Sequence, residues 1–392
     1  MKLLYVTEGI PNRDPVSGDG SSMIPYELLR VLPSDVQVTL LTFAGPAPVP
    51  DVVRRRCEQV VVLPTRSPVW SLIRSVPGRH QAGAQQRHTP TAAREVARRS
   101  AAADVTLIHG PHVLALARHV RGPVVLQTVD PWSIRLGMDR DLARGWRGRY
   151  RSVKRWQALS LERRLPPRAR LLTVGARDAG LWSALLGREV RSVPNGVEEA
   201  ARPARRPGPP VVCFTGSLNY EPNVVSARAL VEEIAPQLWR RLPTTRFLVA
   251  GRQPTAEVLA LAGERVEVLP NVASMLEVFH RADVAVFPDR HGVGIRNSVR
   301  EAVAAGLPVV ATSAAAREQQ DHPLLQVEHT TEGLVARVLE VLEAAQQGCR
   351  HEPAGAAAVG RSRSWADAAA EYVAELRAAA VEEDTVSVGS AS

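Results

Sequence analysis

Short apolar runs rich in Val, Leu and Ile recur along the chain, and helix-length segments separate them. In the first half the runs lie at 3–7, 36–43, 59–63, 104–108, 123–129 and 170–174. In the second half they lie at 210–215, 246–250, 265–269, 283–287 and 307–311. The runs are almost continuously apolar, which is typical of strands buried on both faces of a parallel sheet. The pattern therefore predicts an α/β fold whose sheets are covered by helices.

The stretch Glu198–Pro210 is rich in Arg and Pro, which predicts a linker rather than a helix or strand. We expect two Rossmann-like, doubly wound domains with a cleft between them. The boundaries are 1–197 for the first domain, 198–210 for the linker and 211–363 for the second domain. A C-terminal helix at about 364–381 is expected to complete the first domain, and 382–392 to be a disordered tail.

The 392 residues carry a net charge of +9, but only Lys2 and Lys154 among the 49 basic residues are lysines. An arginine bias of this kind reflects a GC-rich genome as readily as nucleic-acid binding. The distribution is more informative, because residues 1–195 carry +15 and residues 196–392 carry −6. We therefore expect the two halves to have different partners, and the first half to face an anionic acceptor or a membrane surface. Nucleic acid is not expected as a partner.

The cysteines Cys57, Cys213 and Cys349 are too few and too scattered for a disulfide framework or a zinc site. No apolar run reaches the roughly 20 residues that span a bilayer. We expect a cytoplasmic protein, at most peripheral to the inner face of a membrane.

The segment 283–310 combines a buried strand, a loop with Gly292 and Gly294, and a helix from about 296 to 305. This arrangement directs backbone N–H groups and the positive end of a helix towards one point. Arg290 and Arg296 flank that point, and guanidinium groups suit phosphate oxygens. Glu301 lies one to two turns into the helix, where its carboxylate can bind ribose hydroxyls. A diphosphate site is one interpretation, and an ordinary βαβ turn with surface arginines is the other.

Three stretches resemble the retaining GT-B glycosyltransferases of family four, in particular exopolysaccharide-associated sugar transferases. They are Val193–Val197, the Phe214–Asn223 segment FTGSLNYEPN, and Gly294–Asn297 together with Glu301–Gly306. The resemblance extends over about 193–312 and more loosely over the first half. It implies a nucleotide-diphosphate-sugar donor (UDP-, GDP- or dTDP-sugar) and a sugar, lipid-linked or small-molecule acceptor. It also implies retention of anomeric configuration.

The expected donor-binding residues are Gly216, Arg252, Asn271, Gly292, Gly294, Ile295, Asn297, Ser298 and Glu301. The barrier lies in breaking the bond between the anomeric carbon and the phosphate, which leaves negative charge on the diphosphate. We therefore assign catalytic roles to Arg290 and Arg296, which can stabilise that charge together with the helix N-terminus. No metal and no tightly bound cofactor is expected.

The sequence departs from the family pattern at two positions. Many members carry a glutamate eight residues before Glu301, where this chain has Val293, and a lysine where it has Ser298. A catalytically degenerate nucleotide-sugar-binding protein is therefore an alternative. A GT-B-like nucleotide-sugar epimerase is another, although no carboxylate and histidine set for that chemistry is evident.

On the acceptor side we expect Gly18 and Gly20, which follow the first strand, His109 and Asp130. In related enzymes a histidine or aspartate at the strand end of Asp130 approaches the reacting sugar, which makes Asp130 the third catalytic candidate. Asp130 can equally cap a helix, the glycines can form a plain loop, and His109 and the neighbouring His112 can be structural.

An apolar stripe with helical spacing lies within 134–165, interleaved with basic residues. Its members are Met138, Leu142, Trp146, Tyr150, Val153 and Trp156. The stripe either packs on the sheet, leaving the basic residues solvated, or lies on an anionic membrane as a basic amphipathic helix. Trp70 with Arg66, Arg74 and Arg79 is a second candidate for the same surface.

Overall fold

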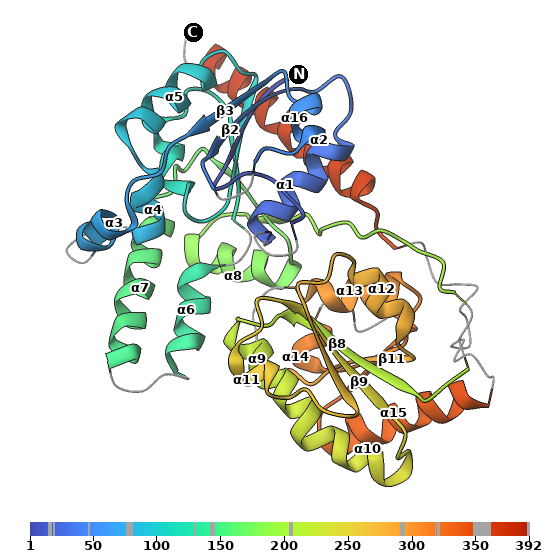
Figure 1. The fold of residues 1–392 in the computed structure, drawn as a ribbon. Helices are drawn as coiled ribbons and strands as arrows, with labels where there is room; N and C mark the ends of the chain where they lie inside the picture. The colour runs from blue at the N-terminus through green and yellow to red at the C-terminus, as the bar shows by residue number, and fades with distance from the viewer. Residues whose placement is uncertain are drawn as a thin grey trace. The chain divides into compact units, whose positions relative to one another are not determined.

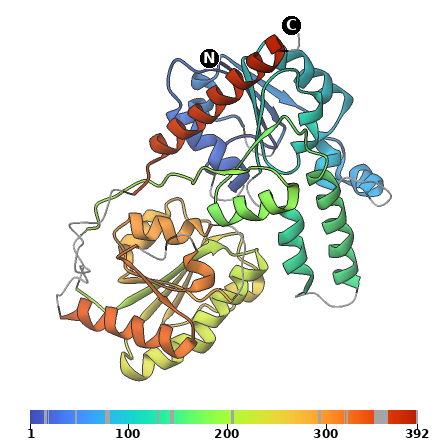
Figure 2. The same cartoon turned by 180° about the vertical axis from the view of Figure 1, so that it is seen from behind.

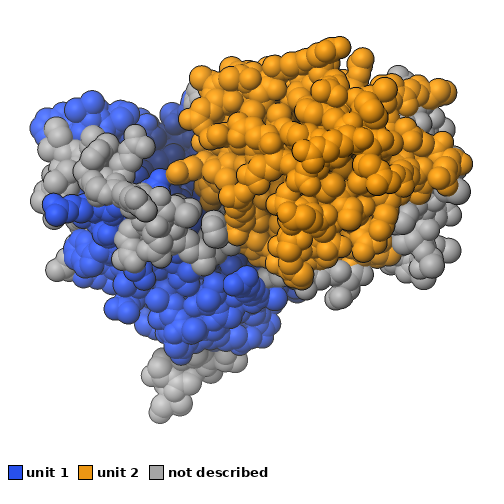
Figure 3. All heavy atoms as spheres, turned by 90° about the horizontal axis from the view of Figure 1, so that it is seen from below, with its two compact units in different colours: residues 1–13, 17–195, 365–392 blue, residues 14–16, 196–364 orange. Residues whose placement is uncertain are grey.

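The computed structural model describes the chain apart from residues 15–17, 19, 46–47, 76–80, 129–130, 142–145, 204–206, 291–294, 318, 320–321, 348–361 and 390–392. Two compact units make up the structure (Figure 3). Unit 1 comprises Met1–Arg13, Ser17–Asn195 and Trp365–Ser392, and unit 2 comprises Asp14–Val16 and Gly196–Ser364.

Unit 1 contains a parallel sheet of seven strands in the order β3-β2-β1-β4-β5-β6-β7 (Figure 1). The strands are β1 (Lys2–Thr7), β2 (Gln37–Phe43), β3 (Gln59–Leu63), β4 (Val105–His109), β5 (Val124–Gln127), β6 (Arg170–Thr173) and β7 (Arg191–Ser192). Its helices are α1 (Gly20–Val31), α2 (Asp51–Arg56), α3 (Pro68–Ser75), α4 (Ala82–Arg87), α5 (Pro90–Ser100), η1 (Leu114–His119), α6 (Trp132–Asp141), α7 (Trp146–Glu162), α8 (Ala176–Leu186) and α16 (Trp365–Gly389). The central strands are fully buried, as their apolar sequences predict.

The last helix returns to unit 1, where it packs on α1, β4 and β5 (Figure 2). Tyr372 is buried, and its hydroxyl accepts a hydrogen bond from the Gln127 side chain on β5. Arg170 forms an ion pair with Glu375 at 2.6 Å and a second one with Glu382. The helix continues to Gly389, so it is longer than the expected 364–381 and takes up most of the expected tail.

Unit 2 contains a parallel sheet of six strands in the order β10-β9-β8-β11-β12-β13. The strands are β8 (Val211–Ser217), β9 (Arg246–Arg252), β10 (Val266–Pro270), β11 (Val284–Phe287), β12 (Val309–Thr312) and β13 (Leu325–Glu328). Its helices are α9 (Glu221–Arg228), η2 (Ala229–Ile234), α10 (Ala235–Arg241), α11 (Ala256–Leu259), α12 (Met275–Arg281), α13 (Asn297–Ala304), α14 (Ser313–Ala316) and α15 (Thr331–Gln346). Helices α10 and α15 lie together, as do α12 and α13, so both faces of the sheet are covered (Figure 1).

All eleven expected strands are present, and two short edge strands were not expected. β7 has only two residues, which is too short to produce a hydrophobic pattern. β13 lies at the edge of its sheet and is only partly buried, so its sequence lacks the continuous apolar character of the inner strands. The two Rossmann-like sheets confirm the expected doubly wound α/β architecture of each domain.

At their carboxyl ends, β8 and β9 leave no room for a side chain at Gly251. A Cβ atom on Gly251 would lie 1.8 Å from the backbone oxygen of Gly216, so no larger residue fits without moving the strands. The same Cβ atom would also contact Leu218 in the core. The close contact of these two strands therefore depends on glycine at 251.

We expect Gly251→Ala to lower the free energy of unfolding by about 1–3 kcal/mol or more, because the added methyl group overpacks the strand pair. Urea denaturation measures the change. Gly263→Ala is the matched control, since a Cβ atom there meets nothing within 4 Å. Equal stabilities of the two variants would contradict the close-contact argument.

Candidate functional site

The strand order of unit 2 reverses between β8 and β11, which are parallel neighbours in the middle of the sheet. Their carboxyl ends therefore lie at the same edge of the sheet. Open α/β sheets bind ligands outside the carboxyl ends of their strands at such a switch point. Here the ends of the two strands are Ser217 and Phe287. Gly216, Asp289 and Arg296 of the sequence motifs all lie at this point, so the switch point of unit 2 is the candidate donor site.

Arg296 is the central cation of this site, and its side chain is only 14% exposed. One Nη group donates to Asp289 and, at 3.1 Å, to the side-chain oxygen of Asn223, while the other donates to the backbone oxygen of Thr215 at 3.2 Å. The guanidinium also lies 5.0 Å from the ring centre of Phe214 and 4.7 Å from that of Phe287. Burial lowers the pKa of Arg296, and the charge of Asp289 opposes that change.

Asp289 is the counter-ion of Arg296. It is 7% exposed and accepts a hydrogen bond from Ser226 Oγ at 2.8 Å in addition to the bond from Arg296. Its backbone oxygen accepts from Thr312 Oγ1 at 2.6 Å, which ties the end of β12 to the same point. The pair Asp289–Arg296 therefore connects the ends of three neighbouring strands with α9.

Asn223 was missed as a site residue, although it closes the FTGSLNYEPN motif. Its amide donates to the backbone oxygen of Ser217 at 2.9 Å while its side-chain oxygen accepts from Arg296. A Cβ atom on Gly216 would lie 2.9 Å from this amide nitrogen. Gly216 therefore leaves the room that Asn223 needs to bridge the β8 loop and the buried arginine.

The adjoining strand ends carry an amide network. Asn219 donates to Gln253 at 2.6 Å, and the backbone N–H of Gln253 donates to the side chain of Asn271 at 2.8 Å. Gln253 and Asn271 have φ of 49° and 52°, and within the described residues they are the non-glycine residues with positive φ. Backbone strain of this kind concentrates at functional sites. Arg252, the last residue of β9, donates to Ser217 Oγ at the end of β8 at 2.9 Å.

The helix α13 begins at the same switch point, directly after Arg296. The side chain of its N-cap residue, Arg296, makes no capping hydrogen bond. Uncapped backbone N–H groups at a helix N-terminus bind anions, including phosphates. The expected residues Asn297 and Ser298 lie in this first turn, and Ile295 lies just before the N-cap. All three are half-buried, as is Glu301 one turn further on. Gly292 and Gly294 lie outside the described residues.

Arg290 takes a different position from Arg296. It is exposed and donates from one Nη to both carboxylate oxygens of Glu233, at 2.7 and 2.8 Å. This surface pair leaves Arg290 mobile enough to exchange partners at small cost, since exposed ion pairs contribute about 0–1 kcal/mol. The sequence analysis assigned the same role to both arginines. In the structure Arg296 is a buried structural cation, whereas Arg290 is exposed.

Unit 1 has its own switch point between β1 and β4. Glu8 follows β1, is 8% exposed, and accepts a hydrogen bond from the backbone N–H of His112 at 3.0 Å. Gly110 follows β4 with φ of 105°, and a Cβ atom there would lie 2.7 Å from the Glu8 side chain. Sequence reasoning missed this carboxylate, although its place directly after the first strand was a usable signal.

The expected acceptor-side residues lie at different depths. His109 is fully buried on β4 and meets Tyr5 edge-on, with 6.4 Å between ring centres, which favours the structural interpretation. Gly20 begins α1, and Gly18 is buried just before it. Asp130 lies outside the described residues.

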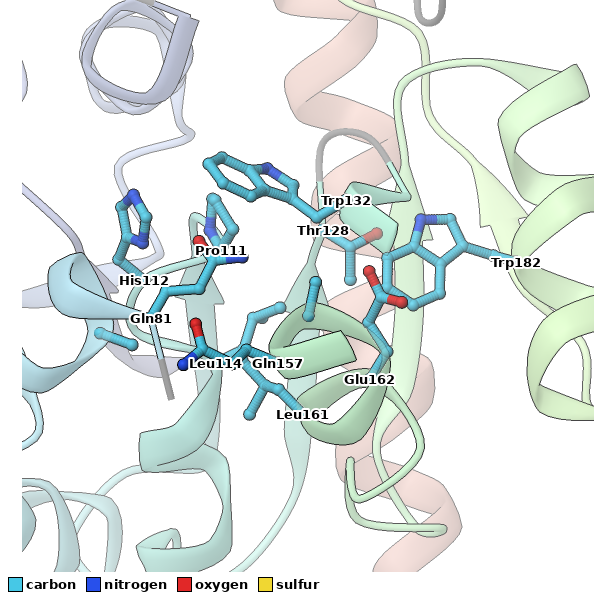
Figure 4. Close-up of a pocket in the computed structure, with 12 residues that line it drawn as sticks. Gln81, Pro111, His112, Leu114, Thr128, Trp132, Gln157, Leu161, Glu162 and Trp182 are labelled. Carbon is cyan, nitrogen blue, oxygen red and sulfur yellow. The ribbon is translucent and has the colours of Figure 1, made fainter. Parts of the chain in front are cut away.

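A small pocket lies beyond β4 and β5 in unit 1 (Figure 4), with a volume of about 20 Å³, enough for about one water. Figure 4 shows the Glu162 carboxylate beside the Trp182 indole. Glu162 accepts the Ser133 N–H at 2.9 Å at the start of α6, and its other oxygen has no partner among the described residues. Burial raises the pKa of Glu162, against the opposing effect of its hydrogen bonds to Ser133 and Trp132.

Comparison with known proteins places these features in a family context. Residues 209–344, all within unit 2, match the family model described as "Glycosyl transferases group 1". No curated protein sequence matches the chain.

Several solved structures are similar to the whole chain. HepE of Anabaena, in complex with UDP and glucose, is 14% identical with a TM-score of 0.66, covering 96% of this chain and 99% of that one. WaaG, a glycosyltransferase involved in lipopolysaccharide biosynthesis, is 15% identical with a TM-score of 0.58, covering 94% of each chain. A putative UDP-N-acetylglucosamine 2-epimerase from Listeria monocytogenes is 12% identical with a TM-score of 0.55, covering 95% and 94%. These likenesses confirm the GT-B type of fold.

We expect Asp289→Asn to lower the free energy of unfolding by about 3–5 kcal/mol, because it leaves the Arg296 charge buried without a counter-ion. Glu233→Gln, which breaks the exposed pair with Arg290, is the control and should cost less than about 1 kcal/mol. Chemical denaturation of both variants checks this. A cost for Asp289→Asn as small as that of the control would show that Arg296 is hydrated rather than buried.

Glu162 gives a second expectation, in the pH dependence of stability. Because its pKa is raised, the Glu162 carboxyl stays protonated in the folded chain at pH values where it is ionised in the unfolded chain. The free energy of unfolding therefore falls as the pH rises from about 4.3, the unfolded pKa, through the folded pKa. Glu162→Gln should therefore gain stability relative to the wild type as pH rises through this window. Hydrogen bonds from Arg98 and Arg99 lower the pKa of Glu95, so Glu95→Gln should show the opposite trend. Denaturation curves at several pH values measure both, and trends of equal sign would refute the assignment.

Proposed function

We propose that this chain is a glycosyltransferase of family four that transfers a sugar from a nucleotide diphosphate sugar to an acceptor bound by unit 1. The observation that carries the proposal is the match of 209–344 to group 1 glycosyl transferases, over the stretch that builds the switch point. The family resemblance of the motifs adds retention of configuration and catalysis without a metal. HepE was solved with UDP and glucose, which puts UDP first among the donor nucleotides.

The proposed mechanism rests on charge stabilisation of the leaving diphosphate. The N-terminus of α13 offers backbone N–H groups to phosphate oxygens. Arg296 adds a fixed positive charge beneath that point, held by Asp289 and Asn223. Preorganised groups of this kind need no reorganisation as charge develops, which is the main source of their catalytic effect. In this scheme Arg290 exchanges Glu233 for the diphosphate when the donor binds.

The other donor contacts follow from the edge of the sheet. Glu301, one turn into α13, is proposed to bind the ribose hydroxyls. The strained pair Gln253 and Asn271, with Arg252, lines the neighbouring strand ends and is proposed to hold the rest of the nucleotide. On the acceptor side, Asp130 is the proposed catalytic residue, and Glu8 offers a second carboxylate near the end of β1.

A thermal-shift panel of UDP, GDP, dTDP and ADP, each with and without its sugar, tests the donor site. A ligand at a hundredfold excess over Kd stabilises the fold by about 2.7 kcal/mol, which raises the melting temperature measurably. Glu301→Ala should abolish the shift. Glu343→Ala is the matched control, because Glu343 is likewise a half-buried helical glutamate of unit 2.

Two results would contradict the proposal. One is a panel in which no nucleotide raises the melting temperature, and the other is a shift that Glu301→Ala and Glu343→Ala reduce equally. If a nucleotide sugar stabilises the fold but no sugar reaches water or any acceptor, the chain is the degenerate binding protein. Conversion of the donor sugar into its epimer would identify the isomerase alternative.

A further inference from the structure

Helices α3 and α7 of unit 1 leave large apolar side chains in solvent. On α7 the exposed fractions are 46% for Tyr150, 47% for Val153 and 54% for Trp156. On α3, Val69 and Trp70 are each 66% exposed. Trp70 and Trp156 are the exposed tryptophans among the described residues. The second half of the apolar stripe thus faces solvent rather than the sheet.

The C-terminal part of α7 makes the packing contacts of this helix. Gln157 and Ala158 are buried there, and Gln157 donates to the backbone oxygen of Ser75 at 2.6 Å. Gln81 in turn donates to the backbone oxygen of Lys154 at 3.2 Å. These bonds join α7 to the ends of α3 and α4, which lie beside it (Figures 1 and 2). The exposed side chains of α3 and α7 therefore belong to one part of unit 1.

The charge of this part has a single sign. No Asp or Glu occurs between Glu58 and Glu95, a stretch with five arginines. None occurs between Asp141 and Glu162, a stretch with five arginines and Lys154. On α7, Arg149 and Arg155 are exposed, and the Lys154 ammonium lies 4.6 Å from the ring centre of Tyr150.

We propose that this α3–α7 surface, made of Val69, Trp70, Arg149, Tyr150, Val153, Lys154, Arg155 and Trp156, docks the protein on an anionic lipid bilayer. Trp and Tyr favour the bilayer interface, where the ring is half in hydrocarbon and its polar group stays hydrated. Basic residues at the same level are attracted by anionic headgroups. Large exposed apolar side chains gathered on one part of a domain mark an interaction site, and the one-signed charge of this part selects an anionic partner. No helix among the described residues has the length and apolar character to cross a bilayer, so the proposed contact is peripheral.

Co-sedimentation of the full chain with vesicles tests this surface. The wild type should pellet with an equimolar mixture of phosphatidylcholine and phosphatidylglycerol and stay in solution with phosphatidylcholine alone. Binding should weaken as salt rises from about 0.1 to 1 M, where the screening length falls from about 10 to 3 Å. The double variant Trp70→Ser/Trp156→Ser should bind at least tenfold more weakly, and Arg149→Gln/Arg155→Gln should lose most of the preference for anionic lipid.

Matched controls come from unit 2, where Val225 and Leu259 are 44% and 47% exposed. Val225→Ser/Leu259→Ser should bind vesicles like the wild type, and all variants should keep the wild-type melting temperature. The nucleotide-induced shift should also be unchanged in the tryptophan variant, so failure here is distinguishable from failure of the donor site.

Three outcomes would overturn the membrane assignment. The first is equal vesicle binding by the wild type and the tryptophan variant, or none by either. The second is retention on single-stranded RNA at physiological salt with no vesicle binding, which would make the surface a nucleic-acid site. The third is a concentration-dependent dimer that the tryptophan substitutions abolish, which would assign the surface to a second copy of the chain.

Discussion

Burial of the central strands on both faces constrains everything else in the two units. Helices must cover both sides of each sheet, so the chain winds outward from β1 in one direction and then the other, and likewise from β8. At the reversal the crossover connections leave opposite sides of the sheet, and the carboxyl ends of two neighbouring strands remain uncovered. Each unit therefore has one point where polar chemistry can be placed without disturbing the core.

In unit 2 this point is occupied by a buried cation that the protein itself holds in place. Arg296 lies on the rings of Phe214 and Phe287 and is held by Asp289, Asn223 and the backbone of Thr215. A buried pair of this kind contributes little net stability, because desolvation offsets the attraction of the charges. Its value here is positional, since it fixes the strand ends and α9 around the start of α13. An anion bound at that helix meets donors that are already in place.

Sequence patterns were sufficient for the inner strands and for the region of the donor site, and insufficient for the roles of individual residues. The glycine loop and the helix after β11 located the site, because their spacing is a local property. The sequence could not distinguish buried Arg296 from exposed Arg290, because their positions depend on which carboxylate each one meets in the fold. Arg296 meets Asp289, and Arg290 meets Glu233. Gln253 was missed for the same reason, as its backbone conformation is visible only in the fold.

The sequence by itself determined a pair of parallel α/β domains and a basic first half. The apolar runs and the glycines indicated the domains, and the uneven charge indicated the basic half, because strand burial and net charge depend on composition along the chain. Tertiary structure decided which part of α7 packs inward. Gln157 and Ala158 are buried against the end of α3 and the pocket beside Glu162, whereas Tyr150 and Val153, seven and four residues before Gln157 on the same face, remain exposed. A helical stripe marks one face of a helix, and only the neighbours that the fold supplies decide how much of that face is covered.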